Sequence, residues 1–255
     1  MRAAPALALL AGVLASLPAR AESLLISLSV QRVAVNSTFT GSSIVVFGSV
    51  ERDARTVARP GPYDLVITVR GPRQSLTVRE KERLGPIWLN RGQQKFVEVP
   101  AFLSVLASRP LTEVTGEVSR RRLRIGLDAI VAAPDLTFAS ERADDPFRAA
   151  LLRLRTGQKL FREDERGVQF LTPTLFRATV TLPETAPVGG YDVEAMLLAG
   201  GTELAREQSR FELVKSGFER RMALFARDWS PAYAVAAVVF ALLFGWLASV
   251  IFRRD

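Results

Sequence analysis

The chain has 255 residues, of which 48% are hydrophobic, and a formal net charge of +8. It contains neither cysteine nor histidine. These absences exclude disulfides, thiol nucleophiles, serine–histidine hydrolases, cupin-type sites and zinc-dependent hydrolases. Carboxylates remain as acid–base candidates, but a glycosidase needs two of them at a defined separation that sequence spacing does not reveal. We therefore expect a protein that is not an enzyme, with no catalytic, cofactor-binding or metal residue.

Residues 1–21 have the three parts of a signal peptide. Arg2 supplies a short positive region, and an apolar run from Ala6 to Leu17 is too short to cross a bilayer. Small residues at Ala19 and Ala21 fit the positions that a signal peptidase reads. We expect cleavage after Ala21 and export of the following chain, the alternative being a short uncleaved membrane anchor.

Residues 22–109 have a sequence pattern that predicts short strands. Apolar residues alternate with serines after Ser23, and β-branched runs occupy 43–50 and 64–70. Glycine and proline punctuate these runs, for example at Gly71-Pro72 and Gly85-Pro86. Short strands with frequent turn signals are typical of an immunoglobulin-like β-sandwich.

Residues 110–215 predict a second β-sandwich domain that contains a helical segment. Asp144-Asp145-Pro146 is a capping signal, and apolar residues then recur at helical spacing from Phe147 to Leu154. Strand texture returns from 168 to 214, where we expect Tyr191 and Val193 on opposite faces of one strand. The expected fold class is mainly β, with two immunoglobulin-like β-sandwich domains, a helical insertion and one C-terminal transmembrane helix.

Residues 216–230 form a juxtamembrane amphipathic segment. Four large apolar residues follow one another at spacings of four, three and four, which places them on one helical face. We expect this face to lie on the outer leaflet of a membrane, while packing on the preceding domain stays an equal alternative. The four residues are Phe218, Met222, Phe225 and Trp229.

Residues 231–252 carry no charged side chain and are long enough to span a bilayer core of about 30 Å. The signal peptide decides the orientation, so the bulk is expected in the periplasm and residues 253–255 in the cytoplasm of a bacterial inner-membrane protein. Small residues recur every four positions along this helix and predict contact with a second copy or with a membrane protein partner. These residues are Ala237, Ala241, Gly245 and Ser249. The alternative is that small residues are simply frequent in such helices.

The most unusual soluble segment places Trp88 and Asn90 after the basic residues Arg79, Lys81 and Arg83. One interpretation is a basic, aromatic surface that binds anions. We favour the other, in which Trp88 closes the core of a β-sandwich and an exposed basic strand precedes it.

A second basic run spans residues 119–124. It indicates a solvated face, or a contact with anionic lipid or a partner. Nucleic acid is not an expected partner of an exported chain.

Nine short segments of the chain carry a resemblance to a known family: 39–41, 44–48, 70–72, 79–83, 87–90, 125–128, 161–164, 175–178 and 217–219. In these segments, and across almost the whole of the expected mature chain, the sequence resembles an uncharacterised alphaproteobacterial family of putative transmembrane proteins. The resemblance implies a periplasmic domain with a C-terminal transmembrane helix, no assigned catalytic residue, and a genetic neighbourhood that includes anion or sulfite exporters.

Two functional hypotheses follow. The first is a non-enzymatic accessory or interaction subunit of a membrane partner, for which an anion or sulfite exporter is the candidate that the resemblance suggests. The alternative is a membrane-tethered periplasmic binding module for a small anionic ligand. Neither requires a cofactor.

Overall fold

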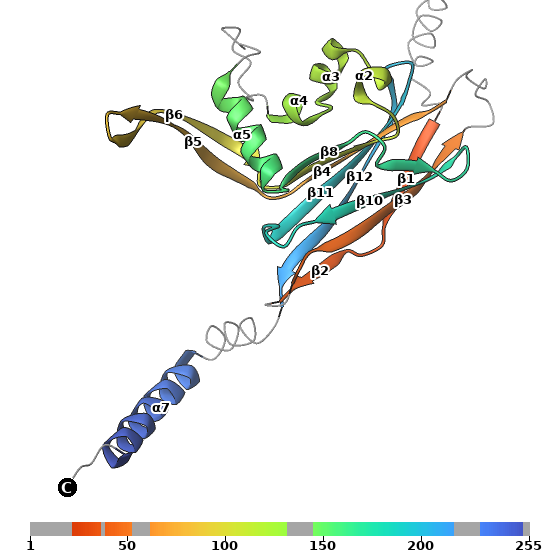
Figure 1. Ribbon diagram of the computed structural model, residues 1–255. Helices are drawn as coiled ribbons and strands as arrows, with labels where there is room; N and C mark the ends of the chain where they lie inside the picture. Colours follow the sequence, from red (N-terminus) through yellow and green to blue (C-terminus); the bar gives the residue numbers. More distant parts are fainter. Residues whose placement is uncertain (1–21, 37–38, 53–61, 132–144, 217–229, 252–255) are drawn as a thin grey trace, which may run out of the picture.

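The computed structural model describes residues 22–36, 39–52, 62–131, 145–216 and 230–251 (Figure 1). These residues form two sheets, a separate two-stranded hairpin and several helices. The expected signal peptide lies outside the described residues. The predicted interfacial face also lies outside them, namely Phe218, Met222, Phe225 and Trp229.

The first sheet has four strands in the order β1-β3-β10-β9, and every neighbouring pair is antiparallel. Its strands are β1 (Glu22–Leu28), β3 (Ser42–Arg52), β10 (Leu175–Leu182) and β9 (Val168–Phe170). In β10 every second side chain is buried. Because successive side chains of a strand point to opposite faces, the alternating sequence gives this strand one apolar face toward the core.

The second sheet has six strands in the order β2-β12-β11-β4-β7-β8. The pairs β2–β12 and β7–β8 are parallel, and the others are antiparallel. Its strands are β2 (Arg32–Val35), β12 (Thr202–Lys215), β11 (Gly189–Ala199), β4 (Asp64–Arg70), β7 (Leu103–Ala107) and β8 (Phe161–Asp164).

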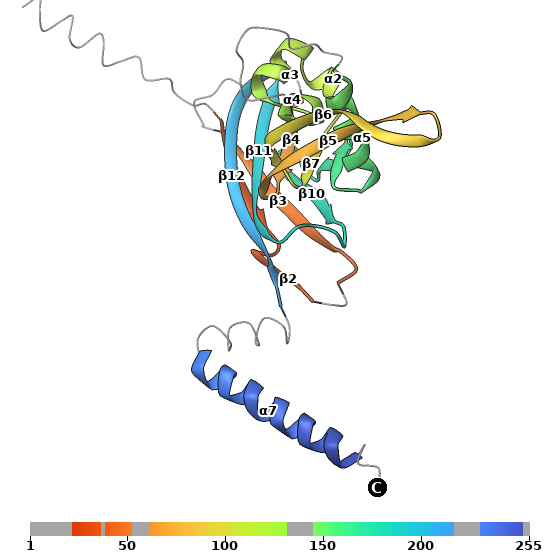
Figure 2. The same cartoon turned by 90° about the vertical axis from the view of Figure 1, so that its left-hand side faces the viewer.

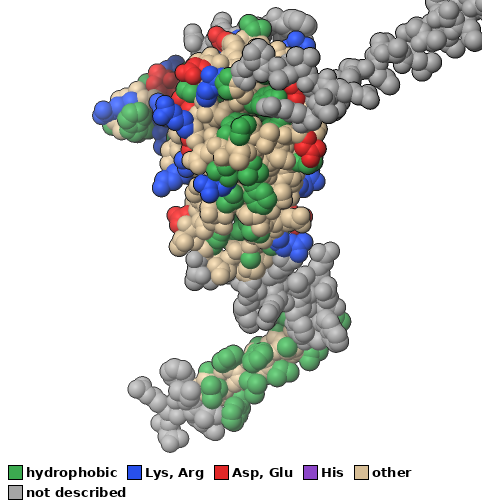
Figure 3. Space-filling model, turned by 90° about the vertical axis from the view of Figure 1, so that its right-hand side faces the viewer, with side chains coloured by type: hydrophobic (Ala, Val, Ile, Leu, Met, Phe, Trp, Pro, Cys, Tyr) green, Lys and Arg blue, Asp and Glu red, His purple; other side chains and the backbone are tan. Residues whose placement is uncertain are grey.

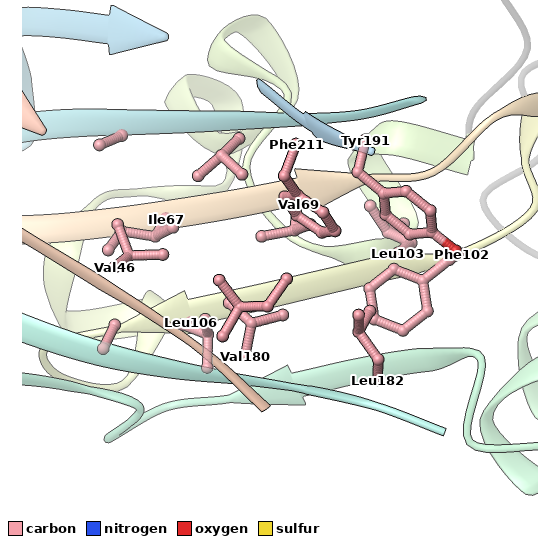
Figure 4. Close-up of a cluster of buried hydrophobic side chains, with 14 of the residues drawn as sticks. Val46, Ile67, Val69, Phe102, Leu103, Leu106, Val180, Leu182, Tyr191 and Phe211 are labelled. Atoms are coloured by element: carbon pink, nitrogen blue, oxygen red, sulfur yellow. The ribbon is translucent and has the colours of Figure 1, made fainter. Parts of the chain in front are cut away.

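The main core lies between the two sheets, where side chains of both interlock (Figure 4). Tyr191 is fully buried, stacks on Phe211 with ring centroids 4.8 Å apart, and donates a hydrogen bond to the carbonyl oxygen of Pro187 at 2.6 Å. Val193 is buried in the same cluster. The expectation that Tyr191 and Val193 lie on opposite faces is wrong, because side chains two residues apart in a strand share a face.

The prediction of two domains divided at residue 109 is also wrong. β3 pairs with β10, and β4 pairs with β11, so strands from both sides of that boundary complete the same two sheets. Alternation shows that a segment forms a strand and which face is apolar, but it does not identify the partner strand. The mainly β class is confirmed, while the immunoglobulin-like description stays a prediction.

Three short helices cover part of the outer face of the six-stranded sheet. They are α2 (Leu111–Val114), α3 (Glu117–Leu123) and α4 (Leu127–Val131). Val66, Met196 and Leu198 point away from the main core, and they form a second apolar cluster with residues such as Leu111 and Val114. This cover explains why β11 is apolar on both faces.

Helix α5 (Pro146–Gly157) begins where the sequence indicates. The Asp145 carboxylate accepts a hydrogen bond from the Phe147 amide at 3.0 Å, and Pro146 occupies the first turn. Leu151 is buried against the core, whereas Leu154 is exposed, so the apolar face is narrower than its spacing predicts.

Two further elements lie outside the sheets. Strands β5 (Arg73–Leu84) and β6 (Ile87–Pro100) form an antiparallel hairpin, and α7 (Ser230–Ile251) is a C-terminal helix of 22 residues. In the part of the chain that the structure describes, no helix combines the length and the hydropathy needed to cross a membrane. The transmembrane helix therefore stays a prediction.

Candidate functional site

The β5–β6 hairpin projects from the body (Figure 2), and buried side chains occur only near its root. Val78 and Phe96 are buried there. Helix α5 covers this root: the amide nitrogen of the Gln94 side chain donates to the Asp145 carboxylate at 3.0 Å, and Gly92 approaches the Phe147 ring so closely that an added Cβ would lie 2.9 Å from it. The root is thus fixed in place, and the outer part continues beyond the helix.

The register of the hairpin brings the predicted anion-surface residues together. Arg79, Lys81 and Arg83 are at alternate positions of β5, so they share one face, and the register shift between Glu80 and Lys81 is taken up in β6 at Arg91. Lys81 is paired with Asn90, and Arg83 is paired with Trp88. Because directly paired residues of an antiparallel ladder point to the same side, all five lie on this face, which we call the basic face.

The favoured assignment of Trp88 to a sandwich core is wrong. Its side chain is 64% exposed, close to the end of the hairpin. A period-two pattern predicts one apolar face, but it does not say whether another layer covers that face. Here α5 contacts Gly92 and Gln94, which lie on the other face of the hairpin, and no layer of the described residues packs over Trp88.

The basic face carries an uncompensated positive charge. Lys95 is paired with Thr77 and extends the face toward the root. The two glutamates of the outer hairpin, Glu80 and Glu82, point to the opposite side, where Glu82 accepts two hydrogen bonds from Arg91 at 2.9 and 3.0 Å. None of the ion pairs between described residues involves a cation of the basic face: Arg79, Lys81, Arg83 or Lys95.

The opposite side of the hairpin end is apolar, which the sequence interpretation missed. Leu84 is paired with Ile87, and Leu89 is paired with Glu82, so the three apolar side chains adjoin one another. All three are exposed. Their signal in the sequence is a Gly85-Pro86 turn with large apolar residues on both sides. In Figure 3 the projecting part at the upper left shows hydrophobic and basic side chains next to each other.

A shallow cleft of about 430 Å³ lies at the other end of the six-stranded sheet. Its main polar feature is a bidentate pair, in which Arg109 donates to the Asp64 carboxylate at 2.7 and 2.6 Å. Asp64 is buried, and the hydrogen bond to Asp64, followed by its charge, raises the pKa of Arg109. The pair joins the start of β4 to the end of β7. Since the two residues lie 45 positions apart, no local pattern could have revealed it.

The predicted helix-packing residues are all exposed on α7: Ala237, Ala241, Gly245 and Ser249. A Cβ added at Gly245 would have nothing within 4 Å among the described residues. The arrangement leaves room for a close approach by another helix.

The described residues contain no group of three or more Asp or Glu side chains that could hold a metal ion.

The family described as "Putative transmembrane protein (Alph_Pro_TM)" matches residues 23–254 of the chain. No curated protein and no solved structure gives a significant match.

Proposed function

Because the chain belongs to this family of putative transmembrane proteins, we propose that α7 anchors it in a bacterial inner membrane as a non-enzymatic accessory subunit of a membrane partner. The body then lies in the periplasm, and residues 253–255 lie in the cytoplasm. A second copy or another membrane protein is the partner, and an anion or sulfite exporter is the candidate that the family resemblance suggests.

The observation that carries this proposal is the apolar surface of α7. The helix covers 22 residues, or about 33 Å, and contains no charged residue. Side chains such as Leu242, Phe244 and Trp246 are 68%, 66% and 66% exposed around it, which is costly in water and favourable in lipid. Figure 3 shows hydrophobic side chains over the described surface of this helix.

The exposed small residues on α7 support a partner within the membrane. Lipid chains are as apolar as leucine, so no hydrophobic drive brings helices together there, and association depends on close packing. Small side chains at Ala237, Ala241 and Gly245 permit that approach.

The test replaces Gly245 by leucine. Gly245→Leu fills the space at the small face and should reduce crosslinking and co-purification of the partner in mild detergent by roughly tenfold or more, as expected for a lost close contact. Val239→Leu, which lies off that face, is the matched control. Equal recovery of the partner with both variants would contradict the accessory role of α7.

Topology has its own test. A reporter that is active only in the periplasm, fused after Val214, should be active. A silent periplasmic reporter, together with an active cytoplasmic reporter at the same position, would contradict export of the body.

A second candidate function is a tethered binding module for a small anionic ligand, and the basic face of the hairpin supports it. In this case the purified full chain would bind sulfate or phosphate without a protein partner, and Lys81→Gln would weaken that binding. Co-purification of a stable partner, together with no measurable anion binding, would favour the accessory role instead.

A further inference from the structure

The end of the β5–β6 hairpin exposes large apolar side chains on both of its faces. Leu84, Ile87 and Leu89 are 62%, 54% and 45% exposed on one side, and Trp88 is 64% exposed on the other. Large apolar side chains that are exposed together at one end of a hairpin and rimmed by charged residues are typical of an interaction site. We call these four residues the apolar tip.

The distribution of the apolar tip indicates which occupant fits it. A flat protein surface covers one face of a projecting hairpin, and would leave either Trp88 or the three aliphatic residues in water. The headgroup and upper acyl region of a bilayer surrounds an inserted tip on all sides. The unpaired outer edges of both strands limit insertion to this shallow depth, because backbone groups there still need water or polar headgroups.

The charges point to the same occupant. Arg79, Lys81 and Arg83 stand directly behind Trp88 on the basic face, without ion-pair partners among the described residues. Tryptophan favours the level of the lipid headgroups, and long cationic side chains extend from that level to lipid phosphates. We propose that the β5–β6 hairpin docks on an anionic lipid surface, with the apolar tip in the interface and the basic face against the phosphates.

Docking on the membrane that holds α7 rests on the proposed function. β4 leads into the hairpin from the end of the sheet at which β12 leads toward α7: Arg70 is paired with Asp192, and Leu213 is paired with Gly189 nearby. The hairpin then extends away from that end, toward the level of the helices α2 and α3 (Figure 2). The 14 residues from 216 to 229 separate β12 from α7 in the sequence. A connection of this length spans at most about 50 Å.

The test uses Trp88 as the reporter in the full chain. Trp229→Phe and Trp246→Phe remove the other two tryptophans, and the chain is held in nanodiscs of zwitterionic lipid. Vesicles with brominated acyl chains, either anionic phosphatidylglycerol or zwitterionic phosphatidylcholine, are then added. Trp88 fluorescence should shift to shorter wavelength and be quenched by the anionic vesicles, and high salt should weaken the effect.

Charge variants measure the contribution of the basic face. Each cation near an anionic surface changes affinity by roughly fivefold, so the triple change Arg79→Gln, Lys81→Gln and Arg83→Gln should weaken vesicle binding by about 100-fold. Arg91→Gln is the matched control, because the Arg91 side chain forms an ion pair with Glu82 on the opposite face of the hairpin. It should weaken vesicle binding less than Lys81→Gln does. Circular dichroism should be unchanged in all variants, since the replaced side chains are exposed.

Several results would overturn lipid docking. Quenching that is equal in both lipids and insensitive to salt would contradict the claim that the basic face binds anionic lipid. Displacement of the vesicles by inorganic phosphate would assign the face to a free anion. An unquenched Trp88 that crosslinks to a protein in native membranes would assign the tip to that protein. Loss of the chain from the nanodiscs would contradict anchoring by α7 alone, and the same vesicle titration on the free chain would still test the hairpin.

Discussion

Two long antiparallel hairpins of this protein differ in how much of their apolar surface is buried. β11–β12 turns at Gly200-Gly201 and lies in the middle of the six-stranded sheet, while β5–β6 turns at Gly85-Pro86 and projects into solvent. In β11 the main core covers one face, and the short helices cover much of the other. In β5–β6 only the root is covered, by α5. The comparison shows that a hairpin's neighbours decide whether its apolar residues become buried core or exposed surface.

The largest expected difference in the free energy of unfolding is between two aromatic residues of these hairpins, Tyr191 in β11 and Trp88 in β6. Tyr191→Ala removes a fully buried ring that packs on Phe102 and Phe211, and should lower the free energy of unfolding by about 3–5 kcal/mol. Trp88→Ala removes an exposed ring and should change it by less than about 0.5 kcal/mol. Denaturant unfolding of the full chain in mild detergent, followed by circular dichroism, measures both. Similar losses would mean that Trp88 is core after all.

A second pair tests which face of the β5–β6 root is covered. Phe96 of β6 is buried in the core cluster, and its neighbour Val97 is 53% exposed. Phe96→Ala should cost about 3 kcal/mol, because it leaves a cavity between the hairpin and the core. Val97→Ala, one residue further along the same strand, should cost less than about 0.5 kcal/mol. The same unfolding measurement applies, and a negligible effect of Phe96→Ala would show that the hairpin is not anchored to the body.

Ion pairs provide a third comparison. Arg109→Ala leaves the buried Asp64 carboxylate without its bidentate donor and should lower the free energy of unfolding by about 2 kcal/mol. The pair of Arg91 and Glu82 on the hairpin is exposed on both sides, so Arg91→Ala should cost less than about 0.5 kcal/mol. Added salt should alter the stability change of the Arg91 variant more than that of the Arg109 variant. The reverse order of losses would refute the burial argument.

The smallest expected effect concerns the Tyr191 hydroxyl. Burial raises the pKa of Tyr191 above its ordinary value of 10.0. Since the folded pKa is the higher one, the stabilisation by neutral Tyr191 is fully present below about pH 10 and is lost as pH rises toward the folded pKa. Tyr191→Phe should cost about 1 kcal/mol at pH 7 through the lost hydrogen bond to Pro187, and should reduce the loss of stability between pH 10 and 11. Identical alkaline curves for both proteins would contradict the assignment.

Local sequence signals predicted several elements correctly. Asp145 and Pro146 marked the start of α5, and the strand pattern after residue 168 indicated β10. These features depend on residues within a few positions of one another, so they can be read locally. The five residues of the basic face were named from the sequence as a candidate anion surface, but the interpretation favoured there, in which Trp88 is core, is wrong.

The sequence could not show which strands pair. β3 and β10 are separated by more than 120 residues, yet they are neighbours in one sheet. Partner choice depends on the total burial achieved by the whole chain, and no local pattern encodes it. The prediction of two domains failed for this reason.

The sequence by itself determined which residues alternate, which helix is capped by an aspartate, and that chemistry based on cysteine or histidine is absent. Only the tertiary structure decided that Tyr191 is core and Trp88 is surface, although both are aromatic residues in long strands. The physical reason is that burial belongs to contacts between layers. α5 packs on the face of the β5–β6 hairpin that carries Val78 and Gln94, whereas Trp88 and the neighbouring cations lie on the opposite face, which no described layer covers.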